Sequence, residues 1–315
     1  MAKVRGPLLS KFCSGSIGDR LTFSVRKSGQ QARFQRAQKI KSLTWKQADN
    51  QTLYRLIYSY YSIFPEFLRD FLNSLVNTLG LSMTGWNAYF KIASDNPKDA
   101  LGLSAYWSMN RSLNQTILDL SKNGNTGRLK PYFLINSPIY SKSKNSKMFY
   151  SLYFDGFDDY VDVSSSSDLD IGDSFSISVW IKTSNTSLNT ILHRGSSGLD
   201  TGYSISVASG EPSNNSFSIE GVSDFKWGPY PGDGKWHHVV FVYDSIYSKM
   251  IVYVDGEFVQ EKTVSGTPTG FYNQDLYIGK AKNGSYPFSG NIDELGIYNR
   301  VLSFKEVKIL HNVFV

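Results

Sequence analysis

The stretch DGKWHHVVFVYD, residues 233–244, decides the fold of this chain. An apolar run, Val239–Val242, follows an Asp-Gly turn and two adjacent histidines, His237 and His238. Neighbouring side chains of a strand point to opposite faces, so the two histidines cannot bind one ion without a bulge. With only two other histidines in the chain, we interpret the stretch as the start of a strand rather than a metal or catalytic centre.

Short alternating runs of this kind recur through the second two thirds of the chain, separated by Gly, Asn, Asp and Ser. They are FSISVWIKT (175–183), TGYSISVAS (201–209), SFSIEGVS (216–223), KMIVYVDGEFVQEKTV (249–264) and QDLYIGKAK (274–282). Many short strands with turn signals predict an antiparallel sandwich or barrel. One C-terminal helix is predicted over 303–312, where Ser303 and Glu306 form a capping box.

The order of motifs in this region resembles a known family. The motifs are SAYWSMN (104–110), DLSKNGNTG (119–127), YFDGFDDYVDV (153–163), FSISVWIK (175–182), DGKWHHVVFVYD (233–244), IVYVDGEFV (251–259), LYIGK (276–280) and FSGNIDELGIYNRVLSFKEV (288–307). Together they resemble the laminin G-like domain of the concanavalin A-like lectin/glucanase superfamily. The resemblance implies a mainly β jelly-roll sandwich over 103–315, with the strand at Tyr106 and Trp107 beside the last one, at 292–298. A departure is the stretch 128–148, where such domains usually have a shorter loop.

Three segments precede this domain. Residues 1–42 form a basic arm in which the alternation around Gly29 predicts a β-hairpin over 21–36. Residues 43–94 have helical spacing of apolar and aromatic residues and predict a helical hairpin, and 95–102 reads as a linker. The aromatic stripes serve either to pack the two helices on each other or to dock on a larger assembly.

The net charge of +6 is unevenly distributed. Residues 1–50 hold 11 Lys or Arg and 2 Asp or Glu, a balance of 11 − 2 = +9, and the other residues hold 22 and 25, a balance of −3. A basic arm suits nucleic acid, an acidic protein surface or anionic lipid, or is simply solvated. The candidate partner-anchoring residues are Arg20, Arg26, Lys27, Arg33 and Arg36.

The N-terminal hundred residues also resemble small structural proteins of tailed phages and prophages. The segments that carry the resemblance are GSIG (15–18), the basic strand pair and SMTGWNAYFK (82–91). It implies a module that joins a virion and displays the lectin-like domain outward. We therefore expect virion proteins as partners of residues 1–94, and multiple copies in an assembly.

The sequence also restricts compartment and membrane topology. No run approaches the ~20 apolar residues of a membrane helix, and the N-terminus lacks the apolar core of a secretory signal. Cys13 is the single cysteine, so no disulfide can form within the chain. We expect synthesis in the host cytoplasm and a location in the virion.

Acidic residues raise the question of glycoside hydrolysis. The clusters are Asp155, Asp158, Asp159 and Asp162, and then Asp293 with Glu294. Two carboxylates 5–10 Å apart could run that reaction. Enzymes of the superfamily place their acids on one strand as Glu-x-Asp-x-x-Glu or Glu-x-Asp-x-Glu, and this sequence has no such motif. We therefore expect no enzymatic activity.

The resemblance implies a structural calcium ion as the one cofactor. In related domains such an ion ties the loop corresponding to DLSKNGNTG to the C-terminal acidic turn, and oxygen donors suit Ca²⁺. Carried over, the ligands are Asp119, Asn123, Asn125 and Asp293. The alternative is a tight Asx-rich turn without a metal.

Sugar binding is the usual expectation for a lectin-like sandwich, and aromatic side chains in loops are its candidates. The loop DFKWGPYPGDG (224–234) carries Trp227 and Tyr230, and Tyr272 stands in a second loop. These rings are either exposed for stacking on a sugar or packed on the edge of the sandwich.

These observations lead to a non-enzymatic virion structural protein with a lectin-like domain for glycans or a host surface. The alternative is a carbohydrate-binding or adhesion protein of cellular origin. A glycoside hydrolase is not expected, because the sequence lacks the acid motif of the superfamily's enzymes. Nucleic-acid binding rests on residues 1–50 alone, and we do not expect it.

Overall fold

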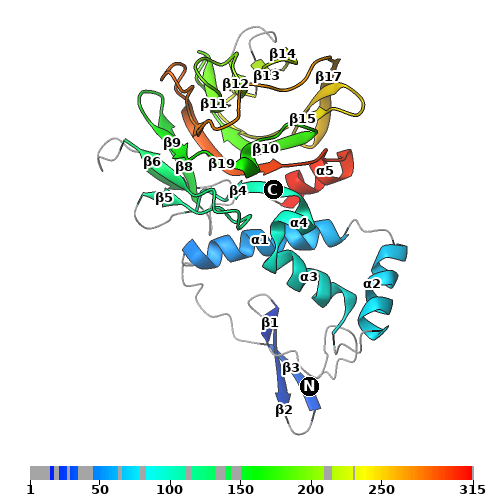
Figure 1. Ribbon diagram of the computed structural model, residues 1–315. Coiled ribbons are helices and arrows are strands. Elements are labelled where there is room, and N and C mark those ends of the chain that lie inside the picture. The colour runs from blue at the N-terminus through cyan, green and yellow to red at the C-terminus, as the bar shows by residue number, and fades with distance from the viewer. Residues whose placement is uncertain are drawn as a thin grey trace. The chain divides into compact units, whose positions relative to one another are not determined.

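The computed structural model describes residues 15–17, 21–26, 29–34, 45–62, 66–78, 83–110, 115–131, 139–142, 150–208, 215–229 and 231–313. The chain divides into two compact units. One comprises Met1–Leu43 and Phe64–Lys91, and the other comprises Thr44–Ile63 and Ile92–Val315. We call them the N-terminal unit and the sandwich unit (Figure 1).

The N-terminal unit contains a small antiparallel sheet of β1 (Gly15–Ile17), β2 (Leu21–Arg26) and β3 (Gly29–Phe34). Strands β2 and β3 pair directly, from Leu21 opposite Phe34 to Arg26 opposite Gly29, as the hairpin predicted over 21–36.

Two helices follow in or across this unit. They are α2 (Glu66–Thr78) and α3 (Gly85–Asp95), the last residues of which belong to the sandwich unit. Asn73 Oδ1 accepts a hydrogen bond from the Gly85 backbone N–H at 2.8 Å, so α2 holds the start of α3.

The sandwich unit consists mainly of two antiparallel sheets, which confirms the predicted jelly-roll class. The first sheet runs in the order β17-β16-β15-β10-β19-β8-β7, with β4 also paired to β19. Its strands are β4 (Leu103–Trp107), β7 (Ile139–Lys142), β8 (Tyr150–Asp155), β10 (Phe175–Lys182), β15 (Trp236–Asp244), β16 (Lys249–Val254), β17 (Glu257–Thr263) and β19 (Ser289–Tyr298).

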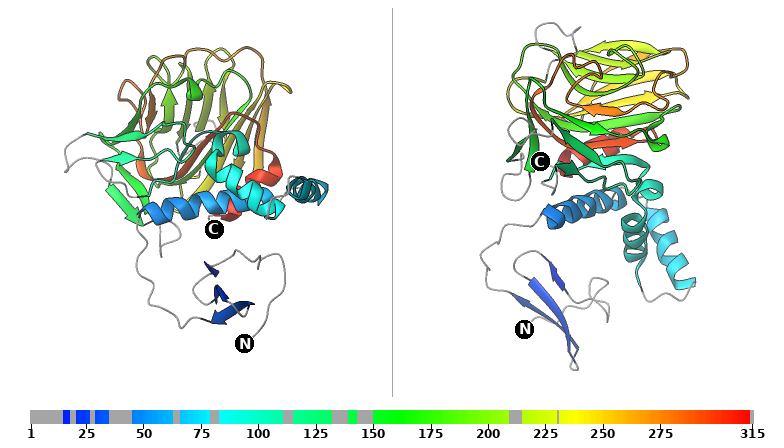
Figure 2. Two further views of the ribbon diagram at one scale, coloured as in Figure 1. Left: turned by 60° about the horizontal axis from the view of Figure 1, so that its bottom comes forward. Right: turned by 60° about the vertical axis from the view of Figure 1, so that its left-hand side comes forward.

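The second sheet runs in the order β14-β13-β12-β11-β18-β9-β6-β5. Its strands are β5 (Thr116–Ile117), β6 (Gly127–Lys130), β9 (Tyr160–Val163), β11 (Asn189–Arg194), β12 (Tyr203–Val207), β13 (Asn215–Ile219), β14 (Ser223–Trp227) and β18 (Leu276–Ile278). Figure 2 shows the two sheets stacked face to face.

Strand alternation places the core between the two sheets. On β10 every second residue from Phe175 to Ile181 enters the hydrophobic core, and on β15 Val239, Phe241 and Tyr243 do the same. The pairing of β10 with β15 brings these two rows together, with Val179 opposite Val239. Within the stretch 233–244, residues 236–244 therefore form a central strand of the first sheet.

Helices cover the outer face of the first sheet, so its central strands are buried on both faces. The covering helices are α1 (Trp45–Ser62) and α5 (Phe304–Val313), which contact each other. Trp180 on β10 stacks on His238 of β15, at 5.1 Å between ring centroids, and on His311 of α5, at 5.4 Å, and the two histidine rings are themselves 5.9 Å apart. Burial on both faces explains the continuous apolar run Val239–Val242.

Helix α1 is attached to the sandwich by polar contacts as well. The Asp49 carboxylate accepts hydrogen bonds from Ser108 Oγ at 2.5 Å and Asn110 Nδ2 at 3.2 Å, and all three residues are buried. Although the sequence places this segment in a separate helical hairpin, α1 belongs to the sandwich unit. Helix α4 (Pro97–Leu101) occupies the stretch predicted as a linker.

The ends of the domain meet as expected. Strand β4 pairs with β19, with Trp107 opposite Leu295 and Tyr106 opposite Gly296. At α5, the Ser303 backbone N–H donates to Glu306 Oε2 at 2.8 Å and the Glu306 N–H donates to Ser303 Oγ at 3.4 Å, which is the predicted capping box. None of the helices in the described part of the chain has the length and apolar character of a membrane-spanning segment.

Candidate functional site

A shallow pocket of about 150 Å³ opens at one edge of the sandwich. Its walls come from the turn after η2 (Ser167–Leu169), the turn between β15 and β16, and the loop after β17. Hydroxyl groups dominate the lining. They belong to Tyr243, Ser245, Ser248, Ser265 and Thr267.

Asp173 is the one charged side chain among the described residues that line the pocket. Burial, together with the nearby Asp173 carboxylate, raises the pKa of the Tyr243 hydroxyl, so this group remains protonated and able to donate. The pocket therefore offers hydroxyl donors and acceptors beside one negative charge, a set that suits a neutral polyhydroxylated ligand.

Hydrogen bonds between the walls hold the pocket in shape. Ser174 Oγ lies 2.9 Å from Ser245 Oγ and accepts the Ser245 backbone N–H at 2.9 Å. The Val264 N–H donates to the Ser248 carbonyl at 2.9 Å. Three turns that are distant in sequence are thereby joined into one rim.

Exposed aromatic and apolar side chains flank the rim. Asp244 Oδ1 accepts the backbone N–H groups of Ile246 and Tyr247, both at 3.0 Å, and this turn leaves the two side chains 83% and 74% exposed. Neither residue is among the binding residues predicted from the sequence. The sequence does contain a sign of their exposure. Two adjacent apolar residues stand in the turn DSIYSK (244–249), and a turn offers no core in which both side chains can be buried.

Tyr272 stands on the other side of the pocket and is 55% exposed. Its hydroxyl lies close to Gly172, which lines the pocket. A Cβ atom built on this glycine would be 3.3 Å from the Tyr272 hydroxyl. The ring contacts buried Phe271 at 4.5 Å between centroids, which fixes its orientation. Of the three aromatic residues predicted for sugar binding, Tyr272 is the one that the structure places at a polar pocket.

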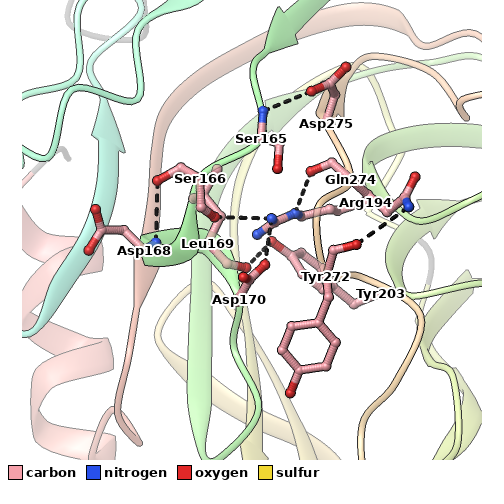
Figure 3. A network of polar contacts seen from close by, with 10 residues as sticks. All are labelled: Ser165, Ser166, Asp168, Leu169, Asp170, Arg194, Tyr203, Tyr272, Gln274 and Asp275. Atoms are coloured by element: carbon pink, nitrogen blue, oxygen red, sulfur yellow. Dashed lines mark hydrogen bonds and ion pairs between the residues drawn. The ribbon is translucent and has the colours of Figure 1, made fainter.

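A fully buried arginine supports the loop that carries Tyr272 (Figure 3). Arg194 donates from Nε to the Gln274 carbonyl at 2.9 Å and from Nη2 to the Asp170 carboxylate at 2.6 Å. Nη2 also donates to the Ser166 carbonyl at 3.0 Å. The guanidinium thus joins β11, the η2 segment and the loop at 272–275, while the Tyr272 ring points away from it.

Trp227 is not a sugar-stacking residue, which corrects the sequence prediction. It is the last residue of β14 and is 1% exposed, because alternation from Phe225 turns its ring into the core against Phe241. A loop that contains Gly and Pro gave no sign that the strand extends to this residue. The other candidate in that loop, Tyr230, lies outside the described residues.

The loop proposed for calcium is closed by its own hydrogen bonds. Asp119 accepts the backbone N–H groups of Tyr106 and Ser121 on Oδ1 and of Asn125 on Oδ2, at 2.9–3.0 Å. The side-chain amide groups of Asn123 and Asn125 donate to the Ser104 carbonyl at 2.8 and 2.9 Å. These contacts explain an Asx-rich loop without a metal.

The fourth predicted calcium ligand, Asp293, is buried on β19 and accepts the Glu294 backbone N–H at 3.0 Å. Calcium at this set of residues stays a prediction. Of the five anchoring residues, Arg26 lies on β2 and Arg33 on β3, and the others lie outside the described residues.

The two adjacent histidines lie on opposite faces of β15, as strand geometry requires. His238 is buried against Trp180, whereas His237 is partly exposed and lies between two carboxylates. His237 Nδ1 is 2.7 Å from Asp255 Oδ2, and its Nε2 is 3.0 Å from Asp233 Oδ1. The histidine pair is therefore part of the framework.

His237 should give the protein a pH-dependent stability. The hydrogen bond to Asp255, and then the one to Asp233, raises the pKa of His237 above its usual value of about 6.5. A raised folded-state pKa contributes stability that is complete below pH 6.5 and is lost as pH rises through the folded value. The melting temperature of the His237→Gln variant should fall furthest below wild type near pH 6, with the gap narrowing at alkaline pH. A gap that stays constant with pH would contradict this expectation.

A family model described as the concanavalin A-like lectin/glucanases superfamily matches residues 154–308, which include the pocket and strands β9 to β19 of the two sheets. These residues form a concanavalin A-like lectin/glucanase domain. The prediction made from the motif order is confirmed.

Solved structures with similar folds include single domains of two larger proteins. The binding domain of Paraclostridial Mosquitocidal Protein 1 is 15% identical with a TM-score of 0.53, over 67% of this chain and 52% of that one. Domain 4 of AbnA, a GH43 extracellular arabinanase from Geobacillus stearothermophilus, in complex with arabinotriose, is 21% identical with a TM-score of 0.51, over 68% and 98%. This chain thus spans about half of the first structure. No curated protein sequence matches the chain.

Proposed function

We propose that the concanavalin A-like domain binds carbohydrate, without catalysis, at the pocket between Tyr272 and Tyr247. The observation that carries the proposal is the exposed Tyr272 ring beside a hydroxyl-lined pocket. A sugar presents an apolar ring face to an aromatic side chain and hydroxyl groups to polar ones, and this pocket offers both partners. The arabinotriose complex of the similarly folded arabinanase domain supports the same ligand class.

The pocket favours a neutral sugar. Its volume of about 150 Å³ has room for one sugar ring, with further rings of an oligosaccharide extending over the rim. Asp173 is the charged lining residue, and a carboxylate repels an anionic sugar such as a sialic acid. Neutral pentose and hexose oligosaccharides are therefore the ligands to test first.

Replacing Tyr272 with alanine should weaken binding of a neutral oligosaccharide about two- to tenfold, since an aromatic stacking contact contributes about 0.5–1.5 kcal/mol. The matched control is Tyr58→Ala on α1, which removes a ring that is 64% exposed on another element. Arabinotriose and an array of neutral glycans serve as probes, with affinity measured by calorimetry for each ligand found. Equal binding by wild type and Tyr272→Ala would place the sugar elsewhere.

The wider role that we propose is a virion structural protein, in which residues 1–94 join other virion proteins and the sandwich is displayed in multiple copies. The charge of +9 in residues 1–50 supports this assignment, since it separates a basic attachment segment from an acidic display domain. Repetition on a particle would also strengthen weak glycan binding through multivalency. Mass spectrometry of purified particles from cells that carry the gene tests it. Finding the protein at the cell surface and absent from particles would favour the alternative, a cellular adhesion protein.

A further inference from the structure

The turn between β8 and β9 gathers three carboxylates that neither the pocket nor the core uses. Asp155, Asp158 and Asp159 each offer one carboxylate oxygen, and the three oxygens lie within 4.8 Å of one another. Asp155 and Asp158 are exposed, whereas Asp159 is only 3% exposed. This convergence of like charge is unfavourable unless a cation offsets it.

The backbone of the turn already satisfies part of the cluster. Asp159 Oδ2 accepts the Asp155 backbone N–H at 3.0 Å, and Asp155 Oδ1 accepts the Phe157 N–H at 2.8 Å. Gly156 takes a φ of +84°, which permits this tight geometry. These contacts fix the positions of the Asp155 and Asp159 carboxylates, but each uses only one oxygen of its carboxylate.

The oxygen that points to a ligand is Asp159 Oδ1. It is buried, and no protein hydrogen-bond donor in the described part of the chain reaches it. A buried carboxylate oxygen without a partner costs free energy of desolvation, so native structures normally supply a partner. A metal ion bound by the three carboxylates would be that partner.

The neighbouring cation does not fill this role. Lys280 lies near enough to Asp158 and Asp162 to sense their charge, but its Nζ is placed over the Tyr160 ring, 3.3 Å from the centroid. No ion pair among the described residues includes Asp155, Asp158 or Asp159. The described part of the chain therefore supplies no ion-pair partner to the cluster, which leaves that role to an ion from solution.

We propose that the β8–β9 turn binds a divalent cation, Ca²⁺, through the carboxylates of Asp155, Asp158 and Asp159. All three donors are hard oxygens, the ligands that Ca²⁺ prefers. Ca²⁺ bonds oxygen at 2.3–2.6 Å, so two of its ligands stand up to about 5 Å apart, which the observed spacing satisfies. Two exposed carboxylates leave room for water to complete the coordination shell. This site is separate from the four residues predicted at the Asp119 loop and from the glycan pocket.

Calcium should stabilise the full-length protein, because an ion that binds only the folded form raises its melting temperature. After EDTA treatment and dialysis, CaCl₂ at about 100 times the dissociation constant should raise that temperature by about 5–10 °C. Calorimetry with CaCl₂ measures binding directly. The Asp158→Asn and Asp155→Asn variants, both at exposed positions, should each bind Ca²⁺ at least tenfold more weakly.

Two controls make the result specific. Asp224→Asn removes an exposed carboxylate elsewhere and should leave the calcium response unchanged. Asp119→Asn tests the other predicted site. The proposal is overturned if wild type shows neither heat of binding nor a melting shift with CaCl₂, if Asp158→Asn and Asp155→Asn respond like wild type, or if the response is lost only in Asp119→Asn.

Discussion

Replacing Arg194 with methionine should lower the free energy of unfolding by about 3–5 kcal/mol. The guanidinium is fully buried and donates to the Asp170 carboxylate and to two carbonyl oxygens. Methionine has a similar length but no donor, so the variant would leave these acceptors without their partner. Urea denaturation, followed by the near-ultraviolet circular dichroism of the buried tryptophans, measures the loss.

The control for Arg194 is a surface pair of similar geometry. Lys249 and Glu261 are 2.7 Å apart, but both side chains are more than a third exposed. The Lys249→Met variant should change the free energy of unfolding by about 0–1 kcal/mol, because water replaces the lost partner. If Arg194→Met were as mild as Lys249→Met, the arginine would not hold the three segments together. Loosening of the loop at 272–275 should also weaken glycan binding, since that loop positions Tyr272.

Replacing Trp227 with alanine should lower the free energy of unfolding by about 3–5 kcal/mol, the usual cost of removing a large buried ring. The ring is 1% exposed and packs edge-on against Phe241 at 5.4 Å between centroids. Denaturant unfolding of the variant is the measurement. A change below about 1 kcal/mol would mean that the ring is not buried in solution.

The Trp227→Phe variant separates this structural role from sugar binding. Phenylalanine retains an aromatic contact with Phe241, and the lost indole N–H has no hydrogen-bond acceptor among the described residues. We therefore expect a folded variant with a smaller loss of stability and unaltered glycan affinity. Reduced affinity in this folded variant would restore Trp227 as a binding residue.

Local signals in the sequence predicted β10, β12, β13, β15, β16, β17 and β18 and a sandwich or barrel, but not β11 or β14. Alternation around Gly29 predicted the hairpin of β2 and β3, and the pattern at 233–244 predicted β15. Period-2 alternation is encoded by neighbouring residues, so it can be recognised without knowledge of the partner strand. The candidate site was less accessible, because Tyr272 was selected for its aromatic ring, whereas its pocket comes from three separate turns.

The sequence by itself determined an antiparallel sandwich or barrel and the opposite orientation of His237 and His238, and its resemblance to the laminin G-like domain implied the jelly roll and the meeting of its first and last strands. Tertiary structure alone decided that Trp227 faces the core, that Arg194 meets Asp170 across 24 residues, and that α1 and α5 cover the first sheet. The physical reason is that each of these depends on which face of a strand or helix meets a distant segment. Register and layer packing fix that choice, and no local pattern encodes it.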